Sequence, residues 1–300
     1  IFIHKMTSKI YLAIILSDYQ ELNLIRYVNY FHIKDKIILI KRSDNKINIS
    51  KFPKNIKKKN FSNKYAFLFY FFLVLFRNIF YKKKFIFGNP AGKFCIFLRK
   101  FINGKNQIYV DDGLQTICYD FSQLKKNCTI FTVYNISLPS KIKKIQYSLK
   151  YLKKRKKTFN KYLFIGTPLV SFKNLSSDKF KKILIILSNK NKKFYYYPHR
   201  NEIIELSLLP NNFKIIRRSS SVEKFVYNYK YNFKAIYSFG SSCLIEISNF
   251  YKKENIKIVD IIKWIENSEH NPQQKIIMKI INNYLRKLKI GTMQLKKINT

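Results

Sequence analysis

Short runs rich in isoleucine, valine, phenylalanine and tyrosine alternate along this chain with longer amphipathic stretches. A strand, a helix and another strand in succession form the pattern of a parallel sheet covered by helices. In the first half we expect strands at 11–16, 36–40, 84–87 and 107–110, with a helix at 19–31. The sequence therefore predicts an α/β fold.

The second half repeats this pattern. A strand at 162–165 turns at 166–168 and is followed by a helix that begins at Ser176 or Ser177 and ends near Ser188. We expect further strands at 193–197, 213–216, 235–239 and 257–261 and a final helix at 272–288. Two successive α/β halves predict two Rossmann-like domains with a cleft between them, and ligands in such folds bind at the carboxyl ends of strands.

A basic, glycine-free segment at 141–157 separates the two halves. We expect it to be helical, and the next apolar run begins near Asn160. The predicted domains are therefore 1–158 and 159–300.

Charge gives a weaker signal than its size suggests. The chain has 59 lysines and arginines against 16 aspartates and glutamates, a formal charge of +43, which is typical of nucleic-acid-binding or membrane-bound proteins. Lysine, isoleucine, asparagine, phenylalanine and tyrosine are all abundant while glycine and proline number only seven each, which indicates an AT-rich genome. No helix-turn-helix, RRM or zinc motif occurs. We expect no specific nucleic acid, and keep a basic nucleic-acid-binding protein as the alternative from another class.

The four cysteines have neither a C-x-x-C spacing nor a neighbouring histidine pair, so we expect free thiols in a reducing cytoplasm and no metal site. The uncharged segment 65–76 is shorter than the roughly 20 residues that span a bilayer. A buried helix is the preferred interpretation, and an interfacial helix is the alternative. The basic segments 51–59 and 141–157 are candidates for peripheral attachment to an anionic inner membrane.

Three short motifs follow predicted strands. Asp111 and Asp112 precede Gly113 directly after the strand at 107–110. Two adjacent carboxylates at a strand end can supply a general base, because the neighbour and the surroundings tune the pKa of the base. A simple turn is the equally weighted alternative, since Asp-Asp-Gly is good turn chemistry.

The second motif is Pro198-His199-Arg200. His199 beside a cation can donate to a phosphate or to a leaving group, and the alternative is a histidine satisfied by Glu202 or by a backbone carbonyl. The third motif is Gly240-Ser241-Ser242, which opens a predicted helix. Its hydroxyls and free N–H groups can cradle a phosphate, and N-capping by one serine is the alternative.

An acid-acid-Gly motif, a histidine-proline element and a paired serine, in this order, resemble the bacterial sialyltransferases of glycosyltransferase family 52 and their polysialyltransferase relatives. The strings Phe-Ile-Gly-Thr-Pro-Leu at 164–169 and Pro-His-Arg-x-Glu at 198–202 are also similar to that family. Many members carry the proline after the histidine, whereas Pro198 precedes His199 here. The resemblance implies a GT-B fold, with the acceptor mostly on the first domain and a CMP-sugar mostly on the second.

The resemblance also implies residue roles. Asp112 is the expected general base, and Asp111 supports it or binds the acceptor. His199 is the third expected catalytic residue and faces the phosphate of CMP. The expected donor-binding residues are Ser241, Ser242, Gly240, Thr167, Pro198 and Arg200. The implied reaction is an inverting, metal-independent transfer of sialic acid, or a related nonulosonic acid, from a CMP-sugar to a glycan acceptor in cell-surface polysaccharide or lipooligosaccharide synthesis.

Several expectations accompany this reaction. The same fold with another nucleotide-sugar donor is the alternative within the class. The expected partners are the CMP-sugar donor, a glycan acceptor, the inner face of the bacterial inner membrane and a second copy of the chain. No cofactor is expected besides the donor substrate.

Overall fold

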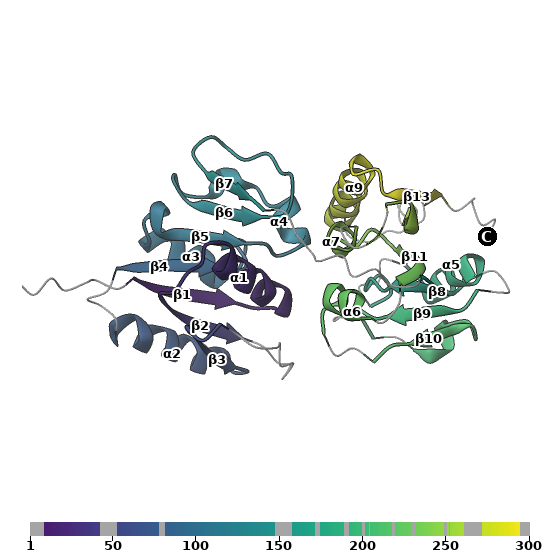
Figure 1. The fold of residues 1–300 in the computed structure, drawn as a ribbon, viewed down its shortest axis with the longest axis horizontal. Coiled ribbons are helices and arrows are strands. Elements are labelled where there is room, and N and C mark those ends of the chain that lie inside the picture. The colour runs from purple at the N-terminus through teal and green to yellow at the C-terminus, as the bar shows by residue number, and fades with distance from the viewer. Residues whose placement is uncertain are drawn as a thin grey trace, which may run out of the picture. The chain divides into compact units, whose positions relative to one another are not determined.

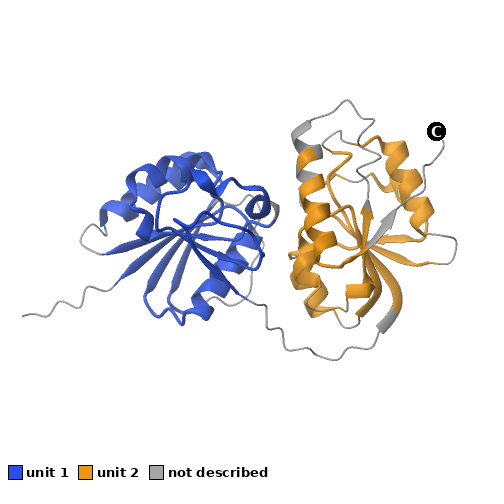
Figure 2. Ribbon diagram, turned by 90° about the horizontal axis from the view of Figure 1, so that it is seen from above, with its two compact units in different colours: residues 1–148 blue, residues 149–300 orange. Residues whose placement is uncertain are grey.

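We describe a computed structural model of the chain. It describes residues 9–42, 53–77, 82–147, 158–171, 175–188, 192–199, 202–203, 205–217, 220–229, 232–248, 251, 253–260 and 272–294. The chain divides into two compact units, residues 1–148 and 149–300, shown in blue and orange in Figure 2.

Unit 1 is built on a seven-stranded parallel sheet in the order β3-β2-β1-β4-β5-β6-β7. The strands are β1 (Ile10–Ile15), β2 (Lys36–Arg42), β3 (Ile56–Phe61), β4 (Lys83–Phe87), β5 (Gln107–Val110), β6 (Thr129–Thr132) and β7 (Lys143–Gln146). Every residue of β1 is buried, because helices cover both faces of the sheet and a continuous apolar run is needed there.

The α-helices in the described part of unit 1 are α1 (Asp18–Tyr30), α2 (Lys64–Arg77), α3 (Lys93–Phe101) and α4 (Leu114–Cys118) (Figure 1). Ser17 begins α1, since its hydroxyl accepts the N–H of Gln20 at 3.2 Å. Helices α2 and α3 pack on the face of the sheet that carries Leu12 and Phe87, where they form one hydrophobic core.

Unit 2 repeats the architecture with six parallel strands in the order β10-β9-β8-β11-β12-β13. The strands are β8 (Thr158–Ile165), β9 (Phe194–Tyr197), β10 (Phe213–Ile215), β11 (Asn232–Ser238), β12 (Ile256–Asp260) and β13 (Gly291–Gln294). The helices are α5 (Ser177–Ser188), α6 (Val222–Asn228), α7 (Cys243–Ile247) and α9 (Pro272–Lys287). The predicted α/β class with two Rossmann-like sheets is confirmed.

Four strands were not expected from the sequence: β3, β6, β7 and β13. The strands β3 and β7 lie at the two edges of their sheet and read IKKKNF and KKIQ. Lysines on an edge strand protect it against pairing with other chains, and they also remove the apolar alternation that marks a strand. The expected helix at 141–157 was wrong in its described part, since β7 lies there; 148–157 lie outside the described residues.

Two further predictions concern the cysteines and the uncharged segment 65–76. The four cysteines are free thiols. The segment predicted as a buried helix is α2, but it is buried on only one side.

Candidate functional site

The first candidate site lies at the carboxyl edge of the sheet in unit 1. All strands of this sheet run parallel, so the residues that follow β4, β5 and β6 emerge at the same edge. They are Gly88, Asp111 and Val133. Ligands of doubly wound sheets bind at such an edge.

Asp111 is fully buried and ties β5 to its neighbours. Its Oδ2 accepts the backbone N–H of Val133 at 2.8 Å, and its backbone carbonyl accepts from Asn23 Nδ2 at 3.1 Å. Asn23 lies on α1, so Asp111 joins the end of β5 to α1 and to the end of β6. The carboxylate of Asp111 therefore positions the turn.

Asp112 is half-buried, and the turn fixes its backbone. Its N–H donates to Thr116 Oγ1 at 2.7 Å, and Gly113 has φ 61° and ψ −120°. A side chain at that φ is strained, so a glycine is required. Burial raises the pKa of the Cys95 thiol to about 12, and the negative charge of Asp112 adds to this rise. The motif 111–113 is therefore a turn, and the same turn holds the carboxylate of Asp112 at the edge of the sheet.

An ion cluster beside this edge was missed by the sequence analysis. Glu21 on α1 is completely buried, and its carboxylate contacts Lys41 Nζ at 2.7 Å and Lys58 Nζ at 3.0 Å. Lys41 is 1% exposed although it belongs to the apolar strand β2. The only signal in the sequence was a lysine directly after the apolar run 37–40.

The second candidate site lies at the carboxyl edge of the sheet in unit 2. Gly166 follows β8 and donates its N–H to the carbonyl of Tyr197, the last residue of β9, at 2.9 Å. Pro198 and His199 follow and are both half-buried. The turn 166–168 and the histidine element are thereby brought together, while Arg200 lies outside the described residues.

Glu202 fixes the loop after β9. Its Oε1 accepts from the Tyr196 hydroxyl at 2.6 Å and its Oε2 accepts from the backbone N–H of His199 at 2.9 Å. A Cβ placed on Gly166 would lie 2.0 Å from Oε2, so glycine is needed for this close approach. Burial raises the pKa of Glu202 to about 7, and the two hydrogen bonds oppose that rise. Glu202 thus accepts from the backbone N–H of His199. This hydrogen bond fixes the backbone of the loop and does not orient the imidazole ring.

The loop after β11 carries the paired serines. Gly240 has φ 80°, and Ser242 occupies the N-cap of α7 without making a side-chain capping bond. Ser241 Oγ lies 3.0 Å from Cys243 Sγ. Capping by Ser242, one alternative for this motif, does not occur. Since α7 has only five residues, its dipole is small and the hydroxyls are the main donors to any anion.

Two buried hydroxyls at this edge lack a hydrogen-bond partner within the described residues: Ser238 Oγ and Thr167 Oγ1. Ser238 is fully buried, ends β11 and is paired in register with Ile165, the last residue of β8. A buried hydroxyl without a partner costs free energy, so such groups usually meet water or a ligand. Thr167 was predicted as a donor-binding residue, whereas Ser238 was not.

Across the part of the chain that is described, no three histidine, cysteine, aspartate or glutamate side chains gather as a metal site would require.

The fold is similar to that of an α/β-galactoside α-2,3-sialyltransferase from the marine bacterium Photobacterium phosphoreum. The TM-score is 0.53 with 12% identity, covering 95% of this chain and 98% of that chain. The spinosyn rhamnosyltransferase SpnG (TM-score 0.49, 7% identity, 93% and 91% covered) and MurG of Acinetobacter baumannii (0.46, 8%, 95% and 85%) are more distant. No family model and no curated protein sequence matches the chain.

The similarity to the sialyltransferase and the two parallel sheets place the fold in the GT-B class, as the resemblance of the motifs implied. At 12% identity the likeness concerns the fold alone, so the activity is argued from the residues of the two sites.

Proposed function

We propose that the chain is an inverting, metal-independent glycosyltransferase that transfers sialic acid, or a related nonulosonic acid, from a CMP-sugar to a glycan acceptor. One observation carries the proposal: Ser238, the last residue of the strand that precedes the Gly240–Ser242 loop, has a buried hydroxyl with no hydrogen-bond partner among the described residues. With Thr167 it gives the carboxyl edge of unit 2 two buried donors that a ligand can satisfy. The resemblance of the motifs to glycosyltransferase family 52 supports the choice of donor.

Unit 2 would hold the donor phosphate. Departure of CMP builds negative charge on the phosphate while the sugar becomes oxocarbenium-like, so catalysis requires hydrogen-bond donors at the phosphate oxygens. In our proposal the hydroxyls of Ser241 and Ser242 and the imidazole of His199 supply them. Pro198 precedes His199 in the same loop, Arg200 follows it in the sequence, and Gly240 allows the backbone to turn toward the ligand.

Unit 1 would serve the acceptor. Asp112 is half-buried, and we propose that its carboxylate removes the proton from the acceptor hydroxyl. Asp111 is a positioning residue, because its Oδ2 already accepts the N–H of Val133. Attack on the face opposite the departing phosphate inverts the anomeric centre.

The first experiment is a thermal-shift titration in EDTA with CMP, UDP, GDP and a short oligonucleotide, since a ligand of the native state raises the melting temperature. We expect selective stabilisation by CMP. The double variant Ser241→Ala/Ser242→Ala should lose this response, and the exposed Ser207→Ala serves as the matched control. Stabilisation by UDP or GDP instead would indicate a donor activated by that nucleotide. Stabilisation by the oligonucleotide alone would favour a nucleic-acid-binding protein.

The second experiment separates chemistry from donor binding. We expect Asp112→Asn to abolish transfer from CMP-sialic acid while its response to CMP stays that of the wild type. His199→Ala should weaken both the transfer reaction and the response to CMP. Near-normal turnover by Asp112→Asn would refute the proposed base. A homodimer and a cytoplasmic location, with cell-surface glycan as the product, remain predictions of the same proposal.

A further inference from the structure

The helix α2 carries an exposed aromatic stripe opposite its buried face. Its buried residues are Phe67, Phe71 and Val74. On the other side Tyr65, Phe69, Phe72 and Phe76 follow one another at helical spacing and are exposed by 78%, 72%, 39% and 69%. Surface helices normally turn charged residues outward, so this stripe is unusual.

The neighbouring helix α3 extends the stripe into a face. Phe94 of α3 joins the two helices, with its ring centroid 5.4 Å from that of Phe67 and 5.2 Å from that of Phe71. Phe97 and Phe101 are exposed on α3, and their own ring centroids are 5.2 Å apart. We name the six exposed aromatic side chains of the two helices the aromatic face: Tyr65, Phe69, Phe72, Phe76, Phe97 and Phe101.

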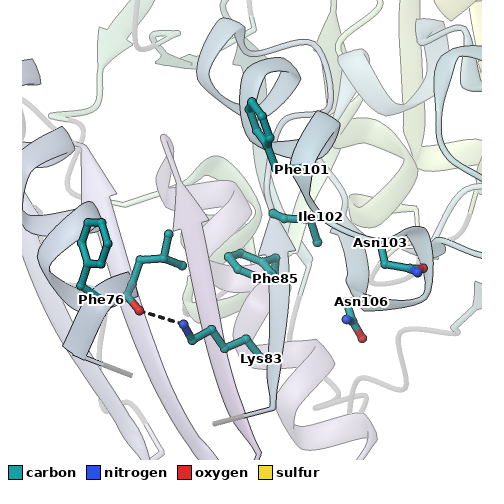
Figure 3. A pocket seen from close by; sticks show the side chains of 8 residues that line it. Phe76, Lys83, Phe85, Phe101, Ile102, Asn103 and Asn106 are labelled. Carbon is teal, nitrogen blue, oxygen red and sulfur yellow. Dashed lines mark hydrogen bonds between the residues drawn. The ribbon is translucent and has the colours of Figure 1, made fainter. Parts of the chain in front are cut away.

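A cavity of about 440 Å³ lies where α2 and α3 end. Figure 3 shows Phe76 and Phe101 on different sides of it, with Phe85 and Lys83 between them. Lys83 Nζ donates to the carbonyl of Leu75 at 2.8 Å. Because Phe76 and Phe101 belong to both, the cavity is continuous with the aromatic face.

The two helices of the aromatic face carry cations and no acidic residue. From residue 45 to residue 110 the sequence contains no aspartate and no glutamate. Exposed cations lie on both helices: Lys64, Arg77, Lys93 and Lys100. An apolar face with cations on both of its helices is complementary to an apolar surface surrounded by negative charge.

We propose that the aromatic face docks on the surface of an anionic phospholipid bilayer. Aromatic side chains are favoured at the boundary between headgroups and acyl chains, and lysines and arginines near the surface are attracted to anionic lipid. Helix α2 has 14 residues, and none of the helices described is both long and apolar enough to cross a bilayer. The helices would therefore lie in the plane of the interface.

The charge pattern disfavours a second copy of the chain as the occupant. In a symmetric dimer the same patch meets itself, so this acid-free region would oppose its own lysines and arginines. A nucleic acid would satisfy the cations, but duplex binding gains little from exposed phenylalanines. A bilayer satisfies both the cations and the aromatic rings.

The test is co-sedimentation with vesicles of phosphatidylcholine alone and of phosphatidylcholine mixed with phosphatidylglycerol. The wild type should bind the mixed vesicles at low salt and the neutral ones much less. We expect Phe69→Ser/Phe97→Ser to weaken binding by roughly tenfold or more, equal to about 1.4 kcal/mol per factor of ten. The matched control is Ile185→Ser/Ile186→Ser on α5, where two exposed isoleucines stand beside exposed lysines; it should bind like the wild type.

A second variant tests the charges separately. Lys93→Glu/Lys100→Glu should lose binding to the mixed vesicles while its unfolding by urea is unchanged, because both side chains are exposed. Equal binding by all variants, or equal binding to both vesicle types, would overturn the proposal. So would a dimer in light scattering that Phe69→Ser/Phe97→Ser dissociates, or an oligonucleotide bound through the same two phenylalanines. The CMP response is expected to be unchanged in these variants, so the proposal stands apart from the proposed activity.

Discussion

The backbone N–H of His199 donates to Glu202 Oε2 at 2.9 Å, and the same carboxylate accepts from the Tyr196 hydroxyl at 2.6 Å. One acidic side chain therefore fixes the loop that carries the proposed phosphate-binding histidine. Its Oε2 also occupies the space that a side chain at position 166 of the neighbouring turn would need. Glu202 thus acts as a positioning residue at the carboxyl edge of unit 2.

The pKa of Glu202 makes stability depend on pH. Burial raises this pKa to about 7 in the folded state, above the ordinary value of 4.5. Between these values the folded chain holds a proton that the unfolded chain has lost, so the free energy of unfolding falls as the pH rises from 4.5 to 7. The decrease is up to roughly 3 kcal/mol and is complete above pH 7.

Urea denaturation from pH 4.5 to 8 measures this dependence. Glu202→Gln cannot ionise, so its unfolding free energy should vary less over the same range. Glu205→Gln, an exposed neighbour, is the matched control and should keep the wild-type slope. A Glu202→Gln slope equal to that of the wild type would show that other groups cause the dependence.

Gly113 should tolerate no side chain. Its φ of 61° and ψ of −120° are strained for any other residue, so Gly113→Ala should lose about 1–3 kcal/mol of unfolding free energy and misplace Asp112. Gly92→Ala is the control, because Gly92 has φ −63° and a Cβ there would meet its nearest atom at 3.5 Å. Chemical denaturation and transfer rates test both variants; equal losses in the two would contradict the backbone argument.

Much of the fold could be predicted because buried parallel strands are continuous apolar runs. The strand at 107–110 and the helix ending at Ser188 agree with β5 and α5. The edge strands β3 and β7 could not be predicted in this way, since they are rich in lysine and gain their stability from pairing with β2 and β6. Such pairing is a property of the tertiary structure.

The candidate sites were predicted in part for a similar reason. Asp111, Asp112 and the 240–242 loop follow apolar strands, and a strand end is visible in sequence. The sequence could not distinguish the anchored Asp111 from the half-buried Asp112. Ser238 and the cluster around Glu21 depend on burial, which arises only when distant segments pack.

The two aspartates should respond differently to substitution. Asp111→Ala removes the acceptor of the Val133 N–H from a fully buried position, so we expect a loss of about 2–3 kcal/mol in unfolding free energy. Asp112→Asn should change stability by less than about 1 kcal/mol but reduce transfer by roughly 100-fold or more. Denaturation and initial-rate measurements on both proteins test this division. The opposite pattern would exchange the two assigned roles.

The buried ion cluster predicts a large effect away from the proposed chemistry. Lys41→Met leaves the fully buried carboxylate of Glu21 with Lys58, which is more exposed, so unfolding free energy should fall by about 3–5 kcal/mol. Lys59→Met, on an exposed position of β3, is the matched control and should change stability little. Adding Glu21→Gln to Lys41→Met should recover part of the loss, because the buried charge is removed. If Lys41→Met costs no more than Lys59→Met, the cluster contributes nothing to stability, and the packing of α1 against β2 must be independent of it.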